Sequence, residues 1–204
     1  MAKILNLYSG IGGNRRLWHE GHEVTAVELD ADIAKVYSSF FPNDRVVVDD
    51  AHEYLRRNFT RFDFIWSSPP CQSHSRARGK SRFPVFPDFG LYEEIVFLQR
   101  YADKSPLWVV ENVIPYYGAL FDGKIMGRHT WWSNFDLPVL SGGGELHREH
   151  SISELESFHG FDLSGHIFDS KKQVLRNCVY GPDGLLVLER ALELLDGDRK
   201  VSTG

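Results

Sequence analysis

The sequence predicts an α/β fold in which a parallel sheet carries helices on both faces. Short apolar runs rich in β-branched and aromatic residues alternate with segments of helical spacing over the first half of the chain. Each run is short enough to be a strand buried on both faces, as strands of parallel sheets are. The length of 204 residues, 42% of them hydrophobic, is enough for one packed domain.

The expected elements alternate regularly until about residue 113. Strands are expected at Lys3–Leu7, Glu23–Val27, Arg45–Val48, Phe62–Trp66 and Leu107–Val110. Helices are expected at Gly13–Glu20, Asp30–Phe41, Asp50–Asn58 and Asp88–Tyr101, with Asp30 and Asp88 as N-caps. A further strand is expected at Trp131–Leu137 and a last helix at Leu185–Leu195. The weakly periodic stretch between those two predicts a small insertion or loops packed beside the sheet.

The composition excludes several classes of protein. No apolar run approaches the ~20 residues that cross a bilayer, and we expect neither a membrane anchor nor a secretory signal. Cys71 and Cys178 are the two cysteines, which excludes a disulfide scaffold and a cysteine-based zinc module. The nine histidines form no recognised metal spacing, so we expect no metal. These features predict a cytoplasmic protein, and the net charge of −5 argues against a surface that binds polyanions everywhere.

Three successive strand ends carry residues suited to a nucleoside. The first expected strand leads into a Gly-rich turn, Tyr8 to Gly13, whose backbone N–H groups can approach a nucleotide-like ligand. Glu28 ends the second strand, where an acid can accept hydrogen bonds from ribose hydroxyls or, alternatively, interact with a helix dipole. Asp50 follows the third strand. A Gly-rich turn alone also occurs without a ligand, but the three strand ends together predict an adenosine pocket.

A cysteine and a carboxylate follow at the ends of the fourth and fifth expected strands. Cys71 comes after two prolines that fix the backbone, at the edge where parallel sheets bind their ligands. A thiolate there can act as a nucleophile, although an isolated cysteine is more often half-buried and inert. Glu111 brings a carboxylate to the same edge, which favours the catalytic interpretation.

Together these residues resemble the cytosine-C5 DNA methyltransferase family. The motifs of that family occur here in their usual order, as Tyr8-x-Gly10-x-Gly12-Gly13, Glu28, Asp50, Pro70-Cys71-Gln72 and Glu111-Asn112-Val113. The resemblance covers roughly Lys3 to Val113. It implies a Rossmann-like S-adenosylmethionine-dependent methyltransferase sheet with helices on both faces and a reduced target-recognition region.

The resemblance implies S-adenosylmethionine as the cofactor. The residues that it places against the cofactor are Tyr8, Ser9, Gly10, Gly12, Gly13, Glu28, Leu29, Asp50, Ala51, Pro70, Asn177 and Val179. The last two belong to a C-terminal stretch in which Arg176 stands where the family has glycine. This departure leaves the packing of that stretch on the cofactor open.

The resemblance also implies the chemistry. Cys71 is expected to attack carbon 6 of a flipped-out cytosine, which makes carbon 5 nucleophilic, and Glu111 is expected to donate a proton or hydrogen bond to ring nitrogen 3. Arg128 is the candidate for holding the flipped base. It is the one arginine in the stretch where the family has Gln-x-Arg-x-Arg.

The segment after Cys71 is basic. A solvated charged loop would have the same composition, but beside a base-flipping cysteine we expect this loop to close over double-stranded DNA. The expected DNA contacts are Gln72, Ser75, Arg76, Arg78, Lys80, Arg82 and Asn112. Positive charge would then be concentrated on one face of an otherwise acidic protein.

The leading hypothesis is a monomeric DNA cytosine-C5 methyltransferase with a short or relaxed target sequence. We expect a catalytic core over residues 1–135, a short target-recognition region over 136–170 and a C-terminal segment, 171–204, that packs back on the core. The short chain suggests a phage or prophage gene, in a bacterial cell or a phage-infected host, with a possible link to restriction-modification. The alternatives are an RNA cytosine-C5 methyltransferase and a noncatalytic methyltransferase-like DNA-binding or regulatory subunit.

Overall fold

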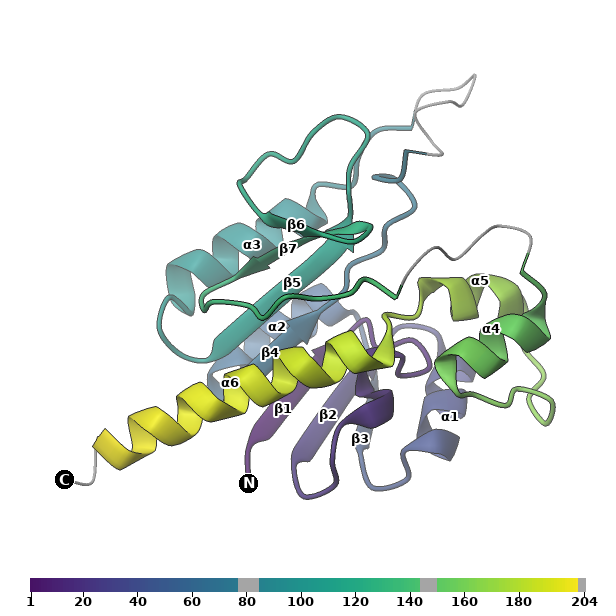
Figure 1. Ribbon diagram of the computed structural model, residues 1–204, viewed down its shortest axis with the longest axis horizontal. Coiled ribbons are helices and arrows are strands. Elements are labelled where there is room, and N and C mark those ends of the chain that lie inside the picture. The colour runs from purple at the N-terminus through teal and green to yellow at the C-terminus, as the bar shows by residue number, and fades with distance from the viewer. Residues whose placement is uncertain (77–84, 144–149, 202–204) are drawn as a thin grey trace.

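The computed structural model describes residues 1–76, 85–143 and 150–201, and within them the chain forms one seven-stranded sheet of order β3-β2-β1-β4-β5-β7-β6 (Figure 1). The strands are β1 (Lys3–Leu7), β2 (Glu23–Glu28), β3 (Arg45–Val48), β4 (Phe64–Ser67), β5 (Leu107–Val113), β6 (Lys124–Met126) and β7 (His129–Ser133). β1 to β5 are parallel, whereas β7 runs antiparallel to β5 and β6 antiparallel to β7. The predicted α/β class is confirmed, with an antiparallel edge added.

The described helices are α1 (Ala31–Phe40), α2 (Ala51–Asn58), α3 (Gly90–Tyr101), α4 (Ile152–His159), α5 (Lys171–Asn177) and α6 (Gly181–Val201), with 3-10 turns η1 (Asn14–Leu17) and η2 (Phe59–Arg61). Asp30 caps α1 as predicted, because its carboxylate accepts hydrogen bonds from two backbone N–H groups of the first turn. The predicted N-cap at Asp88 is wrong by one residue. Phe89 occupies the N-cap position of α3, and the Asp88 carboxylate accepts a hydrogen bond from the N–H of Gly90.

Alternate side chains of the central strands pack on two different layers of helices. Leu5, Ile65 and Val110 belong to a core with α2 and α3, whereas Ile4 and Phe64 belong to a core with α6. Figure 1 shows α6, in yellow, crossing the sheet over β1 and β4. Because both faces are covered, the strands read as continuous apolar runs in the sequence.

The predicted helix at Gly13–Glu20 is wrong, since only the short turn η1 forms between β1 and β2. α6 occupies this face of the sheet instead. The indole nitrogen of Trp18 donates a hydrogen bond of 2.9 Å to the Gly184 carbonyl of α6. A Cβ at Gly184 would lie 2.2 Å from the Asn14 carbonyl oxygen, so η1 and α6 are in direct backbone contact. The sequence around Gly13 gives no sign of a helix that arrives from the other end of the chain.

The stretch predicted to be an insertion or loops contains two helices that pack on the core. Leu155, Phe161 and Leu175 are buried in one cluster with Val36 and Tyr37 of α1. A capping box at the start of α4 and a left-handed glycine at its end set the bounds of this short helix. Part of the range predicted for target recognition, 136–170, therefore belongs to the packed domain. The remaining role of that range stays a prediction.

β7 ends earlier than the predicted strand at Trp131–Leu137. The side-chain amide of Asn134 donates hydrogen bonds to the carbonyl oxygens of Ala102 and Pro106, at 3.0 Å each, and its oxygen accepts one from the N–H of Trp108. These bonds turn the chain away from the sheet. Among the described residues, no helix is both long and apolar enough to cross a membrane.

His159, the last residue of α4, is buried with neither ring nitrogen hydrogen-bonded to another described residue. Burial, assisted by the positive charge of Arg128, lowers its pKa from 6.5 to about 4. The unfolded chain therefore binds a proton near pH 6.5 that the folded chain binds only near pH 4. The contribution of this group to stability is intact above the unfolded pKa and is lost as the pH falls toward 4.

The substitution His159→Leu should remove this acid sensitivity. Between pH 7 and pH 4, the free energy of unfolding of the variant should fall by about 3 kcal/mol less than that of the wild type, because the shift is about 2.5 pKa units. Urea unfolding at a series of pH values measures this difference. His19→Leu, which removes a solvent-exposed imidazole, is the matched control. Identical pH dependence of His159→Leu and the wild type would contradict the assignment.

Candidate active site

A cavity of about 1330 Å³ opens at the carboxyl ends of the parallel strands. It lies where the strand order reverses between β1 and β4, which is the usual ligand site of open α/β sheets. Pockets for one small molecule typically measure ~300–1,000 Å³, so this cavity has room for two ligands. Its walls come from the loops after β1 to β5, from the turn before β7 and from α5.

The Gly-rich turn after β1 forms one wall. Gly10 and Gly13 line the cavity, and Gly10 has positive φ with open space where a Cβ would point. Gly12, which was predicted to contact the cofactor, is not among the lining residues. With φ of +90°, its missing Cβ leaves room for the Phe41 ring, which a Cβ would approach to 2.3 Å. Gly12 therefore allows the turn to pack on α1, and its contact with a cofactor stays a prediction.

Acids line the half of the cavity at β2 and β3. The Glu28 carboxylate accepts hydrogen bonds from the N–H groups of Gly10, at 2.9 Å, and Asp30, at 3.0 Å, which fix its orientation. Asp50 caps α2 by accepting from the N–H of Glu53 and also lines the cavity. Leu29 and Ala51 line it between these acids, as predicted. Since each carboxylate has further lone pairs, both acids remain able to accept hydrogen bonds from a ligand.

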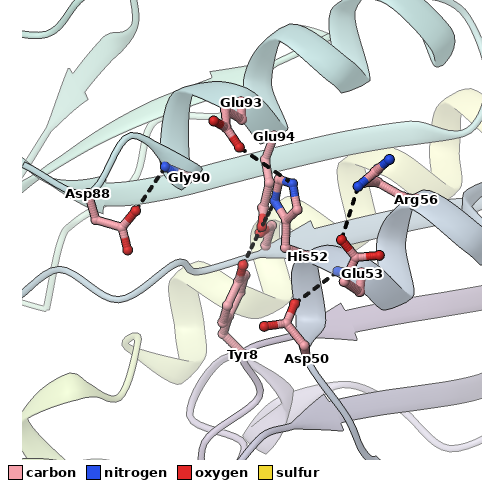
Figure 2. A network of polar contacts seen from close by, with 10 residues as sticks. Tyr8, Asp50, His52, Glu53, Arg56, Asp88, Gly90, Glu93 and Glu94 are labelled. Atoms are coloured by element: carbon pink, nitrogen blue, oxygen red, sulfur yellow. Dashed lines mark hydrogen bonds and ion pairs between the residues drawn. The ribbon is translucent and has the colours of Figure 1, made fainter.

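Glu94 of α3 has a buried carboxylate that holds this acidic part of the cavity wall in place (Figure 2). Glu94 has no solvent exposure and accepts hydrogen bonds from the hydroxyls of Tyr8 and of Ser67, the latter at 2.6 Å. The Nδ1 atom of His52 lies 3.3 Å from the same carboxylate. Burial and the negative charge of Glu94 raise the pKa of Tyr8, and the hydrogen bond to Glu94 raises that of His52.

Sequence reasoning missed Glu94. Its position on the apolar stripe of α3, beside Leu91, Ile95 and Leu98, was the available signal, because an acid at a core-facing helix position needs hydrogen-bond donors. The predicted cofactor contact Tyr8 does line the cavity, and Glu94 fixes the orientation of its ring.

The loop that carries Cys71 is held by backbone and side-chain hydrogen bonds. The Cys71 carbonyl accepts from the N–H groups of His74, at 3.1 Å, and Ser75, at 3.0 Å. His74 is itself buried and its Nδ1 lies 2.7 Å from the Tyr117 hydroxyl. Cys71 therefore lies on a short turn that these hydrogen bonds hold in place.

Asn112 was predicted to contact DNA, and this contact stays a prediction, but the structure gives its side chain a structural role as well. Its side chain is 2% exposed, its amide donates to the Pro69 carbonyl at 2.9 Å, and its oxygen accepts from the N–H of Val113. Asn112 therefore ties the end of β5 to the Pro-Pro-Cys loop after β4. It therefore helps to position Cys71, and it also lines the cavity.

Cys71 and Glu111 share the cavity with Arg128. Burial and the Glu111 carboxylate raise the pKa of the Cys71 thiol, while the positive charge of Arg128 opposes them. Glu111 is buried, and its Oε2 atom has no hydrogen-bond partner among the described residues. A buried carboxylate oxygen without a partner inside a cavity indicates a ligand that binds there.

His129, at the start of β7, is a further residue that the sequence did not single out. Its Nε2 atom lies 3.8 Å from Oε2 of Glu111, the shortest ion-pair distance that Glu111 makes to a described side chain. The available signal was a second basic residue in the stretch that resembles the Gln-x-Arg-x-Arg motif.

The predicted nucleic-acid residues are brought together only in part. Gln72 and Ser75 line the cavity beside Cys71, whereas Arg76 is exposed outside it. Arg78, Lys80 and Arg82 lie outside the described residues. The role of this segment therefore stays a prediction.

Residues 173–179 contribute another wall of the cavity, next to the Gly-rich turn. Asn177 and Val179 line it, as does Pro70 from the opposite side, and all three were predicted to meet the cofactor. A Cβ at Gly13 would lie 2.7 Å from the Val179 carbonyl oxygen, so this segment and the turn pack backbone to backbone. Arg176, in the last turn of α5, also lines the cavity.

The residues present fit S-adenosylmethionine. The buried hydroxyl oxygen of Ser9 has no hydrogen-bond partner among the described residues and lies in the cavity wall. Beside it, Glu28 and Asp50 offer carboxylates to ribose hydroxyls and to the positive charges of the cofactor. Within the described part of the chain, no group of three or more His, Cys, Asp or Glu side chains could hold a metal ion.

The geometry agrees with the similarity of this chain to known proteins. A 133-residue match to the type II methyltransferase M2.BsuMI of Bacillus subtilis is 33% identical and covers 63% of this chain and 33% of that protein. A match to the tRNA (cytosine(38)-C(5))-methyltransferase of Spodoptera frugiperda is 35% identical and covers 54% of this chain and 35% of that protein. The chain thus spans about a third of the length of these relatives.

A solved structure of Spodoptera frugiperda DNMT2 shares 29% sequence identity, with a TM-score of 0.44 over 59% of this chain and 38% of that chain. The family model described as C-5 cytosine-specific DNA methylase matches residues 2–113, more than half of the sequence. Membership in this family implies S-adenosylmethionine as the cofactor. The chain belongs to the C-5 cytosine-specific DNA methylase family.

Proposed function

We propose that this protein methylates carbon 5 of cytosine in double-stranded DNA, through a transient covalent bond from Cys71 to carbon 6. One observation carries the proposal. The Cys71 thiol and a Glu111 carboxylate oxygen that has no hydrogen bond to a described residue share a cavity that is also lined by acids suited to S-adenosylmethionine. A nucleophile, a proton donor and a cofactor site are the parts that this reaction needs.

The cofactor would be held by Ser9, Gly10, Gly13, Glu28 and Asp50. When bound, S-adenosylmethionine supplies an electrophilic methyl group. The acids at this end favour a positively charged ligand, and the positive φ of Gly10 leaves its backbone open toward the cavity. The buried Ser9 hydroxyl would gain the hydrogen-bond partner that it lacks.

Cys71 and Glu111 would activate the base together. Carbon 5 of cytosine becomes nucleophilic when the Cys71 thiolate adds to carbon 6, because the ring electrons shift toward carbon 5 and nitrogen 3. The proton that the thiol releases would reach nitrogen 3 through the Glu111 carboxyl group, which stabilises the charge that develops there and takes the proton back when the product forms. After carbon 5 has gained the methyl group, it loses its proton to water, the sulfur–carbon bond breaks and aromaticity returns. These atoms lie inside the duplex stack, so the base must be flipped out.

The charges around Cys71 imply that the bound cytosine itself promotes formation of the Cys71 thiolate. Burial and the negative charge of Glu111 keep the Cys71 thiol protonated in the free protein. Once Glu111 shares a proton with nitrogen 3, the repulsion between the carboxylate and a thiolate decreases. The thiolate would therefore form preferentially when cytosine is in place, which limits side reactions of the free enzyme.

An RNA substrate is the second candidate. The 35% identity to a tRNA methyltransferase favours it, whereas the family model and the similarity to M2.BsuMI favour DNA. Methylation in mixtures of duplex DNA and tRNA, with excess of either as competitor, distinguishes the two. Inhibition by DNA and not by tRNA is expected.

Replacement of the nucleophile should abolish methyl transfer. We expect Cys71→Ser to lower the rate of label transfer from S-adenosylmethionine to duplex DNA by more than about a thousandfold, because serine is a far weaker nucleophile. Cys178→Ala should keep most of the activity, since burial raises the pKa of this second thiol to about 12. Bisulfite sequencing reports the methylated base and its context. Activity of Cys71→Ser near that of the wild type would exclude the covalent mechanism.

Removal of the Glu111 charge should make Cys71 more reactive toward a small alkylating reagent. Glu111→Gln should lower the pKa of the thiol and raise the rate of its modification by iodoacetamide several-fold near pH 7.5, while methyl transfer decreases. Mass spectrometry of the Cys71 peptide measures the modification. Glu93→Gln removes the same charge from the far side of the cavity and is the matched control. Equal rates in both variants would mean that Glu111 does not act on the thiol.

A further inference from the structure

We propose that Arg128 and Arg176 together bind one backbone phosphate of the nucleic-acid substrate, beside the target base. This inference rests on the proposed function only in that the substrate is a nucleic acid. Arg176 had no assigned role, and it departs from the family motif at a position where glycine is usual. The structure brings it to the same cavity as Arg128, Cys71 and Glu111.

Packing and hydrogen bonds hold the backbone around Arg128 in place. A Cβ at Gly127 would lie 2.7 Å from Cα of Gly142, so the turn before β7 rests directly on the 141–143 turn. That second turn is anchored by Asp183, whose buried carboxylate accepts from the N–H groups of Ser141, at 2.9 Å, and Gly142, at 2.7 Å. The Arg128 carbonyl also accepts from the N–H of Ile114, at 3.2 Å. Arg128 therefore lines the cavity from a turn that is packed on the 141–143 turn.

Neither arginine is neutralised by a residue that the structure describes. Within residues 1–76, 85–143 and 150–201, no carboxylate forms an ion pair with Arg128 or Arg176, and neither guanidinium makes a hydrogen bond. Burial and the repulsion from Arg176 lower the pKa of Arg128. Two guanidinium groups that repel each other and have free donors bind an oxyanion well, because it removes the repulsion and accepts hydrogen bonds from both.

The location favours a phosphate of the nucleic acid as the oxyanion. Arg128 is close enough to Cys71 for its charge to lower the pKa of the thiol, so an anion bound there lies near the base that Cys71 attacks. The described part of the cavity wall contains no other arginine and no lysine. The cavity wall also carries Glu28, Asp50 and Glu53, which would repel a phosphate close to them. Among the described lining residues, Arg128 and Arg176 are therefore the arginines that a phosphate of the flipped nucleotide would meet.

Binding of nucleic acid as a function of salt tests the proposal without any methyl transfer. Fluorescence anisotropy would measure Kd for a labelled cytosine-containing duplex DNA, and for an RNA of the same sequence, with S-adenosylhomocysteine present, between 50 and 400 mM NaCl. Arg176→Gln should weaken binding of the preferred nucleic acid about tenfold at low salt. It should also reduce the slope of log Kd against log salt concentration by about 1, because one phosphate contact is lost.

Two further variants make the result specific. Arg176→Lys keeps the charge and should keep the salt slope, which shows that the charge and not the fold of α5 is measured. Arg56→Gln is the matched control, since Arg56 is an arginine of α2 that pairs with Glu53 at 3.0 Å and does not line the cavity. Its slope should equal that of the wild type.

Equal slopes for Arg176→Gln and the wild type, or no binding of either nucleic acid by the wild type, would exclude the phosphate site. A loss of S-adenosylhomocysteine affinity in calorimetry with an unchanged salt slope would assign the pair to the cofactor carboxylate instead. A reduced slope in a protein that methylates no cytosine would support the phosphate site while the proposed chemistry fails, so the two claims are tested separately.

Discussion

The buried carboxylate of Glu94 is the interaction on which the site depends (Figure 2). It lies on α3 without solvent exposure and joins Tyr8 after β1, Ser67 at the end of β4 and His52 of α2. A carboxylate buried without partners costs several kcal/mol, so these four elements cannot move apart without a large loss of stability. β1 and β4 are also the strands between which the sheet order reverses. The contacts of Glu94 therefore fix the carboxyl ends of β1 and β4, which lead into the cofactor wall and the Cys71 loop.

The cavity built on this edge is lined by groups of both charges. Acids from the loops after β2 and β3 line it, and so do Arg128 and Arg176. Cys71 and Glu111 line the same cavity, where a positively charged methyl donor and a negatively charged nucleic acid would meet. Because electrostatic interactions are strong in a partly buried site, this arrangement orients both ligands before any reaction occurs. It also explains how a chain with a net charge of −5 can bind a polyanion, since the positive charge is needed at one place only.

The sequence predicted where the strands end but not the long-range contacts that hold these strand ends in place. Strands β1 to β5 and the positions of Glu28, Cys71 and Glu111 follow from local pattern, because buried parallel strands are continuous apolar runs and their carboxyl ends meet at one edge. The contacts of Glu94 with Tyr8, of Gly12 with Phe41 and of Asn112 with Pro69 join residues 29 to 86 positions apart, and no local pattern encodes such pairs. The replacement of a helix by η1 has the same cause, since α6 arrives from the far end of the chain. Arg128 was predicted from its motif, but its relation to Arg176 and to His129 depends on how β7 and α5 pack.

The central claim is that Cys71 forms a bond to carbon 6 of cytosine while carbon 5 receives a methyl group. A duplex that contains 5-fluorocytosine tests this directly, because the fluorine at carbon 5 cannot leave as a proton does and the covalent intermediate accumulates. Incubation with the full chain and S-adenosylmethionine, followed by digestion and mass spectrometry, should yield the Cys71 peptide carrying a methylated fluorocytosine nucleotide. No adduct should form without S-adenosylmethionine or with Cys71→Ser. Methylation of unmodified cytosine by the same preparation with no adduct on fluorocytosine, or with an adduct on any other residue, would contradict the account.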